Sequence, residues 1–105
     1  MKQFSVHANK NLATKARLPY LLNVQSDLLS DLETCVVIPL QNGKTMKGKA
    51  LTVLMPVFEI EGKPCVLLTP QLAGVSKKEL GVEITNLSAQ RSDIVAALDL
   101  LVAGV

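Results

Sequence analysis

The chain has 105 residues, the length of a single domain, so we expect residues 1–105 to form one. Hydrophobic residues make up 49% of the chain and charged residues 19%, a balance that excludes an intrinsically disordered protein. The formal net charge of +2 and the 3% aromatic content argue against direct binding of nucleic acid, whether through its phosphates or by stacking on its bases.

Six segments show the alternating or β-branched pattern that is typical of short strands. In chain order they are residues 3–8, 18–25, 35–40, 51–60, 64–69 and 81–86. Residues 9–17 and 41–50 are polar or rich in lysine and predict loops. Residues 61–63, with a glycine at their centre, predict the loop of a β-hairpin.

The last part of the chain changes to a helical period. Six apolar residues fall on one stripe of a helix: Ile94, Val95, Leu98, Leu101, Val102 and Val105. Ser88 or Ser92 is expected to cap the start of this helix, and Gly104 is expected to loosen its final turn. The predicted fold is therefore mainly β, an antiparallel sheet with one C-terminal helix laid on it.

Neither a membrane segment nor a secretion signal is recognisable. No stretch has the ~20 apolar residues of a membrane helix, and the first ten residues contain no apolar segment typical of a signal peptide. We expect a cytoplasmic protein without membrane contact. Cys35 and Cys65 are then expected to be buried free thiols in strands, since their spacing fits no zinc site. No metal ion or other cofactor is expected.

Residue types that carry catalysis are few. Glu59 and Glu61 point to one face of a predicted strand, but a solvated strand end beside a hairpin explains them. His7 is interpreted as a surface or packing histidine, because a nucleophilic mechanism needs a base and an orienting group and no such constellation is recognisable. We therefore expect a protein that is not an enzyme.

Apolar residues occur where water should reach them. Leu28 and Leu29 follow a predicted turn, and residues 100–105 are apolar on every side of the predicted helix end. Packing on the sheet explains a stripe of such residues, but it does not explain Leu100 or Ala103 on the other faces. An exposed apolar helix end indicates an interaction site.

The order and spacing of several short motifs resemble the CcdB family, the toxin half of CcdAB-type toxin–antitoxin systems. The resemblance covers nearly the whole chain, and its most specific parts are the VQSD element followed by two aliphatic residues and the VIPL element. The matching residues are Gln3–Val6, Val24–Leu29, Val37–Leu40, Pro56–Ile60, Leu72–Val75, Leu87–Ser88, Asp93–Ile94, Ala97 and Gly104–Val105.

The resemblance implies a fold and a partner. The fold would be an SH3-like antiparallel barrel with a small extra sheet and one C-terminal helix, assembled as a homodimer. Toxins of this family bind the A subunit of DNA gyrase and trap the enzyme on cleaved DNA, and a CcdA-like antitoxin neutralises them. Such a toxin carries out no bond chemistry, because it only favours one gyrase conformation over another.

The resemblance also implies two sets of binding residues. The gyrase contacts would be Leu28, Leu29, Asp99, Val102, Ala103, Gly104 and Val105, which include the exposed apolar residues found above. The acidic antitoxin would lie on the basic loops, whose charged residues are Lys10, Lys15, Arg17, Lys44, Lys47 and Lys49, although solvated loops also explain this charge.

One position departs from the family pattern. The best-described members end in Trp-Gly-Ile, with the tryptophan central to gyrase poisoning, whereas this chain ends in Ala103-Gly104-Val105. Two alternatives stay open, the first because of this departure and the second because of the shared barrel. The first is a CcdB-like binding module that has lost toxicity. The second is an mRNA endoribonuclease of the MazF and Kid type, which shares the barrel but needs a base, an acid and a cationic group around the phosphate.

Overall fold

The computed structural model describes residues 1–43 and 49–104. Within these residues there are two α-helices, α1 (Lys49–Leu54) and α2 (Arg91–Ala103). The strands are β1 (Ser5–Asn9), β2 (Tyr20–Asn23), β3 (Thr34–Asn42), β4 (Val57–Ile60), β5 (Lys63–Leu67), β6 (Ala73–Ser76) and β7 (Leu80–Asn86). Short 3-10 helices are η1 (Asp27–Leu29), η2 (Thr69–Gln71), η3 (Lys77–Glu79) and η4 (Ser88–Gln90).

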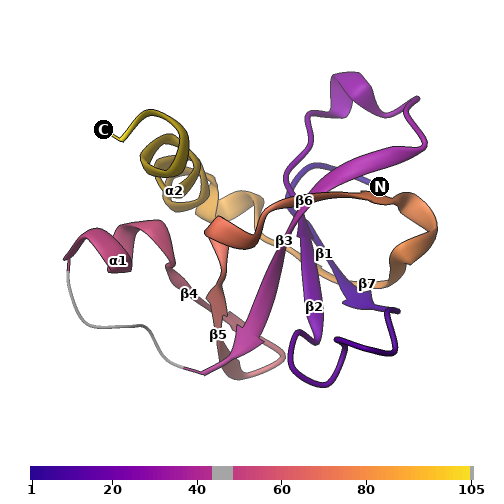
Figure 1. The fold of residues 1–105 in the computed structure, drawn as a ribbon, viewed down its shortest axis with the longest axis horizontal. Helices are drawn as coiled ribbons and strands as arrows, with labels where there is room; N and C mark the ends of the chain where they lie inside the picture. The colour runs from indigo at the N-terminus through magenta and orange to yellow at the C-terminus, as the bar shows by residue number, and fades with distance from the viewer. Residues whose placement is uncertain (44–48, 105) are drawn as a thin grey trace.

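The strands form a curled antiparallel sheet with the order β4-β5-β3-β2-β1-β7. Strand β6 pairs only with the first half of β3 and branches from this order. Figure 1 shows the sheet on one side of the molecule, with α1 and α2 beyond the edge formed by β4 and β5. The predicted fold class, mainly antiparallel β with a C-terminal helix, is confirmed.

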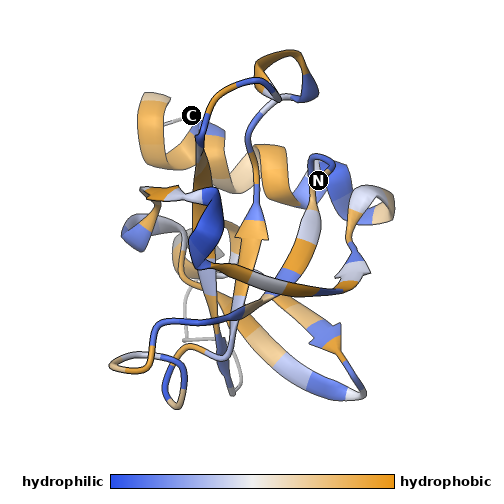
Figure 2. Ribbon diagram, turned by 90° about the vertical axis from the view of Figure 1, so that its right-hand side faces the viewer, coloured by the Kyte–Doolittle hydropathy of each residue, from blue (hydrophilic) through white to orange (hydrophobic). Residues whose placement is uncertain are grey.

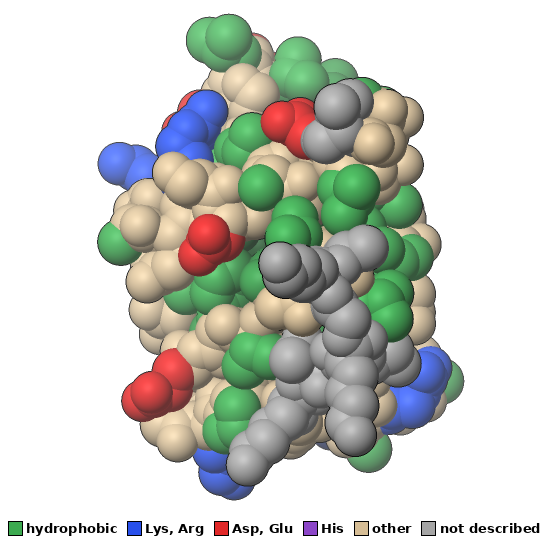
Figure 3. All heavy atoms as spheres, turned by 90° about the vertical axis from the view of Figure 1, so that its left-hand side faces the viewer, with side chains coloured by type: hydrophobic (Ala, Val, Ile, Leu, Met, Phe, Trp, Pro, Cys, Tyr) green, Lys and Arg blue, Asp and Glu red, His purple; other side chains and the backbone are tan. Residues whose placement is uncertain are grey.

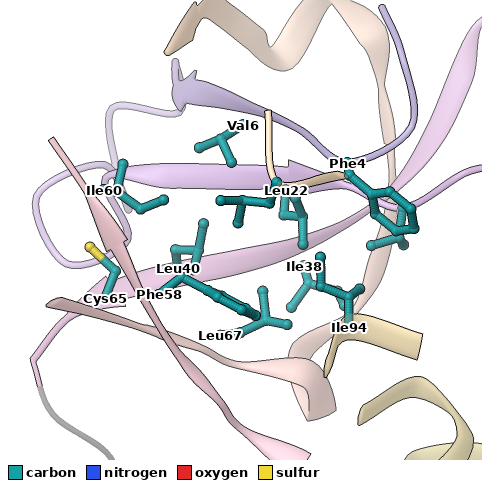
Figure 4. Packing of buried hydrophobic residues seen from close by; sticks show 12 residues of the cluster. Phe4, Val6, Leu22, Ile38, Leu40, Phe58, Ile60, Cys65, Leu67 and Ile94 are labelled. Atoms are coloured by element: carbon teal, nitrogen blue, oxygen red, sulfur yellow. The ribbon is translucent and has the colours of Figure 1, made fainter. Parts of the chain in front are cut away.

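The main core lies inside the curl of the sheet (Figure 4). It is built from aliphatic residues of the strands and two phenylalanines, and α2 contributes Ile94 to it, fully buried. Its central members are Phe4, Val6, Leu22, Ile38, Leu40, Phe58, Ile60, Leu67 and Ile94. Alternate residues of β1, β2 and β3 supply this face, which is the period-two pattern of half-buried strands.

The predicted hairpin joins β4 to β5. Glu61 and Gly62 at its tip both have positive φ, 52° and 78°, the backbone geometry that two-residue hairpin turns require. The turn is held to the centre of the sheet, because the Tyr20 hydroxyl donates a hydrogen bond to Glu61 Oε1 at 2.5 Å. This bond, together with partial burial and the negative charge of Glu61, raises the pKa of Tyr20 to about 12.

We therefore expect a raised titration midpoint for Tyr20, the one tyrosine of the chain. Absorbance of the phenolate should rise around pH 12 rather than at the ordinary 10.0. Since the folded pKa lies above the unfolded one, this contribution to stability is fully present below pH 10 and is lost as the pH rises through about 12. Glu61→Gln should lower the midpoint toward 10, and an unchanged midpoint in that variant would contradict the assignment.

The structure corrects two predictions from the sequence. Residues 51–60 were predicted to be one strand, yet α1 occupies the first part and packs against α2, and β4 begins only after Pro56. Strand β6 was not predicted, because apart from Val75 its residues have little strand preference. Its pairing with residues 34–37 of β3 imposes the extended conformation.

Both cysteines are free and buried, Cys35 in β3 and Cys65 in β5, as predicted. Burial raises the pKa of each thiol, and the positive charges of Lys77 and Lys63, respectively, oppose this rise. Among the described residues, no helix is long and apolar enough to cross a membrane.

Within the described part of the chain, the hydroxyl of Thr69 is the one buried side-chain polar atom without a hydrogen-bond partner. An unsatisfied buried hydroxyl costs roughly 1–3 kcal/mol, and valine has almost the same shape. Thr69→Val is therefore expected to raise the free energy of unfolding by about 1 kcal/mol in urea denaturation. The exposed Thr34→Val is the matched control, with an expected change within about 0.5 kcal/mol. Destabilisation by Thr69→Val would show that the hydroxyl is hydrogen-bonded in solution.

Candidate functional site: two exposed apolar surfaces

The first exposed apolar surface is the η1 segment. Ser26 begins it, because its Oγ accepts a hydrogen bond from Leu28 N at 3.2 Å. Asp27 Oδ1 accepts a second bond, from Gln3 N at 2.8 Å. No residue of η1 is buried, and Leu28 is 93% exposed and Leu29 49% exposed. The segment stands at the top of the molecule in Figure 2 and carries hydrophobic residues there.

The second surface is the C-terminal end of α2. Ile94 and Ala97 are its buried residues, whereas Val102 is 82% exposed and Ala103 is also exposed. Val102 belongs both to the predicted apolar stripe and to the predicted gyrase contacts, and it is exposed because the last turn of α2 extends away from the sheet (Figure 1). Val105 lies outside the described residues.

Gly104 ends α2 rather than loosening it. It adopts the left-handed conformation with φ 73°, and its N–H faces the carbonyl oxygens of Asp99 and Leu100 at 3.2 and 3.1 Å. This is the C-cap geometry that favours glycine. The predicted caps at the other end are also wrong, because neither Ser88 nor Ser92 caps α2. The short helix η4 leads directly into it instead.

The structure brings only part of the predicted gyrase-binding set together. Asp99, Val102, Ala103 and Gly104 share the end of α2. Leu28 and Leu29 lie on η1, on the opposite side of the top of the molecule in Figure 1. One copy of the chain therefore presents two separated apolar surfaces.

A third apolar area, which the sequence did not indicate, lies beside α2. A cavity of about 460 Å³ opens between α1, the start of β4 and α2, and Val53, Val57 and Ala96 are among its lining residues. Val53 and Val57 are substantially exposed. Figure 3 shows hydrophobic side chains spread over this face of the molecule. Exposed apolar side chains gathered on one face make it a candidate protein–protein contact.

Comparison with known proteins identifies the family. The family model described as CcdB protein matches residues 3–104. The chain belongs to the CcdB family. It is thereby a toxin-type protein of the toxin–antitoxin class, as the motifs in its sequence predict.

Solved structures with a similar fold include a toxin and an endoribonuclease. The Mycobacterium tuberculosis toxin MazF-mt6 superposes with a TM-score of 0.72 at 19% identity, covering 92% of this chain and 94% of that chain. An endoribonuclease in complex with its cognate antitoxin, from a mycobacterial species, gives a TM-score of 0.73 at 15% identity, covering 98% and 95%. At these identities the likeness shows that this CcdB-family chain shares their fold.

Of the residues that could support ribonuclease chemistry in this CcdB-family protein, His7 and Arg91 make contacts within the fold. His7 is buried, with Nε2 2.8 Å from Ser5 Oγ and Nδ1 3.0 Å from Gly81 O, so it is a packing histidine as predicted. The Arg91 guanidinium lies 5.5 Å from the centre of the Phe4 ring and donates to Gln3 Oε1 at 3.4 Å. Arg17 lies on the loop between β1 and β2.

The structure describes three of the six predicted antitoxin-binding residues with their side chains. Lys10, Lys15 and Arg17 are exposed on the loop between β1 and β2. Asn9 organises this loop, because its Nδ2 donates to Thr14 Oγ1 at 3.0 Å and to Leu18 O at 2.9 Å. Lys44 and Lys47, together with the side chain of Lys49, lie outside the described residues.

Proposed function

We propose that this CcdB-family protein is a cytoplasmic toxin that binds the A subunit of DNA gyrase and traps gyrase on cleaved DNA. The observation that carries this proposal is the exposed apolar end of α2, fixed by the Gly104 cap, which lies where the family resemblance puts the gyrase contacts. The exposed leucines of η1 are the second contact.

We propose that the toxin acts by binding and not as an enzyme. The one histidine of the chain is buried, with partners at both ring nitrogens, so it has no free position for proton transfer to a substrate. Binding alone is enough to trap gyrase on cleaved DNA if the toxin binds that gyrase conformation more tightly than the others.

A homodimer is the proposed active assembly. The apolar face with Val53 and Val57 beside α2 suits contact with a second copy, and a two-fold pair would present each gyrase contact twice. Light scattering of the purified protein at micromolar concentration tests this, and a mass of one chain would contradict it.

A CcdA-like antitoxin is the proposed neutralising partner. One fold neighbour was solved with its cognate antitoxin, and the exposed cations of the loop between β1 and β2 suit an acidic segment. Charge reversal of Lys10 and Lys15 should weaken antitoxin binding without affecting gyrase binding. Unchanged antitoxin affinity would place the antitoxin elsewhere.

Growth of a bacterium with normal gyrase, combined with an in vitro gyrase cleavage assay, tests the main proposal. We expect growth arrest after induction and an accumulation of cleaved DNA that depends on the purified protein. Ala103→Trp restores the family's aromatic residue at an exposed position and should strengthen poisoning about 5- to 150-fold. A folded dimer that neither arrests growth nor produces cleaved DNA would instead be the non-toxic binding module.

The fold likeness to MazF-type endoribonucleases makes messenger-RNA cleavage the second candidate function. Incubation of the purified protein with labelled RNA distinguishes the two candidates. Growth arrest with cleaved RNA and intact DNA would replace the gyrase proposal, and we expect no RNA cleavage because His7 is engaged within the fold.

A further inference from the structure

The η1 segment and the residues that follow it are unusual in lacking a core contact. Residues 27–34 are all exposed, and η1 itself has no buried residue. Segments with few buried contacts generally open at low free-energy cost, so their conformation depends on polar contacts. Here such contacts come from side chains at both ends of the segment.

Gln25 supplies three of these contacts. Its Nε2 donates to Leu29 O at 3.2 Å and to Thr34 O at 3.1 Å, and its Oε1 accepts from Val36 N at 3.2 Å. Backbone pairing next to β3 ends just before Gln25, since the last backbone hydrogen bond on this side runs from Val24 N to Val36 O at 3.0 Å. The carboxamide of Gln25 therefore takes over the pairing of β3 at Thr34 and Val36, and it links this end of the strand to the carbonyl of Leu29.

Lys77 holds the other end of the segment. Its Nζ donates to Ser30 O at 2.5 Å, and its backbone N–H donates to Glu33 O at 2.9 Å. Gln3 N also donates to Asp27 Oδ1. Hydrogen bonds therefore connect the segment to β3, to η3 and to the N-terminal residues. Polar contacts thus hold Leu28 and Leu29 in one place, and their side chains are left free for a partner.

We propose that Gln25 is a positioning residue that preorganises η1, so that Leu28 and Leu29 are presented to the partner in their bound arrangement. The proposal rests on the proposed function, in which these two leucines contact gyrase. Preorganisation matters because a loop that must be ordered on binding loses part of the affinity that its contacts provide.

Affinity for the purified gyrase A subunit tests the proposal through a double-mutant cycle. Gln25→Ala should weaken binding about tenfold, whereas in a Leu28→Ala background the same change should weaken it by less than about threefold. A residue that acts only on global stability would weaken binding equally in both backgrounds, and this result would overturn the proposal. Gln90→Ala is the matched control, because Gln90 is exposed and its side chain makes no cap hydrogen bond.

Hydrogen exchange of the free protein supplies a readout that does not depend on gyrase. In Gln25→Ala the amides of Leu29, Ser30 and Leu32 should exchange at least about tenfold faster, while amides of β1 and β2 keep their rates. Gln25→Glu should behave similarly, since a carboxylate cannot donate to the carbonyls of Leu29 and Thr34. Unchanged exchange in the segment would overturn the proposal. If the native protein fails to bind gyrase, the proposed function fails, and exchange still decides the role of Gln25.

Discussion

The double variant Leu28→Asp/Leu29→Asp is expected to abolish growth arrest in cells. Leu28 is 93% exposed and Leu29 is half exposed, so the folded protein gains little from their burial. In the complex they would be buried against gyrase, where two unpaired carboxylates cost several kcal/mol. We expect a loss of about 1000-fold in affinity for the gyrase A subunit, or ~4 kcal/mol, in a direct binding titration.

The control for this variant is a leucine of similar exposure elsewhere. Leu12 is 80% exposed on the loop between β1 and β2, and Leu12→Asp should leave growth arrest intact. Both variants should keep the free energy of unfolding within about 0.5 kcal/mol of the native value. Equal loss of toxicity in both would indicate a general effect of added negative charge and would contradict a specific role of η1.

Ile94→Ala is expected to have the largest effect on stability. Ile94 comes from α2, is fully buried and belongs to the same core cluster as Phe4 and Leu22. Truncation of a buried isoleucine costs about 2–5 kcal/mol, because transfer energy is lost and a cavity remains. We expect a loss of about 3 kcal/mol in urea denaturation, with a melting temperature lower by roughly 10–20 °C.

Val102→Ala on the same helix is the matched control for Ile94→Ala. Val102 is 82% exposed, so its truncation should change the free energy of unfolding by less than about 0.5 kcal/mol. It should nevertheless weaken gyrase binding, because it belongs to the proposed contact surface. A large loss of stability in Val102→Ala would show that the end of α2 packs against the fold.

Strands with strong β-branched patterns could be predicted from the sequence, and so could the hairpin at Glu61 and Gly62. Helix α1 was missed because its apolar residues look equally strand-like. The spacing of Leu51, Leu54 and Met55 fits one face of a helix and could have revealed it. Leu54 and Met55 pack in a second small core with Leu18. Local secondary-structure preference does not predict tertiary packing of this kind.

The exposed leucines of the site could be predicted from their position after a turn, but their separation from α2 could not, since it depends on how the sheet curls. The apolar stripe alone also does not show which of its residues are buried, because a helix that extends beyond its sheet keeps the apolar period at Val102 without a partner to bury it. The hydrogen bonds of Gln25 could not be predicted from the sequence, because they depend on how the chain folds back from η1 to the start of β3.

The capped, solvent-exposed end of α2 has an evolutionary consequence. Helix α2 is anchored by Ile94 and Ala97, and its last turn adds little to the core. The fold therefore tolerates substitutions at Val102 and Ala103. Selection acts on these two positions only through what the end of α2 binds. A lineage can exchange tryptophan for alanine at such a place without losing a folded protein, so target preference can drift while the scaffold stays the same.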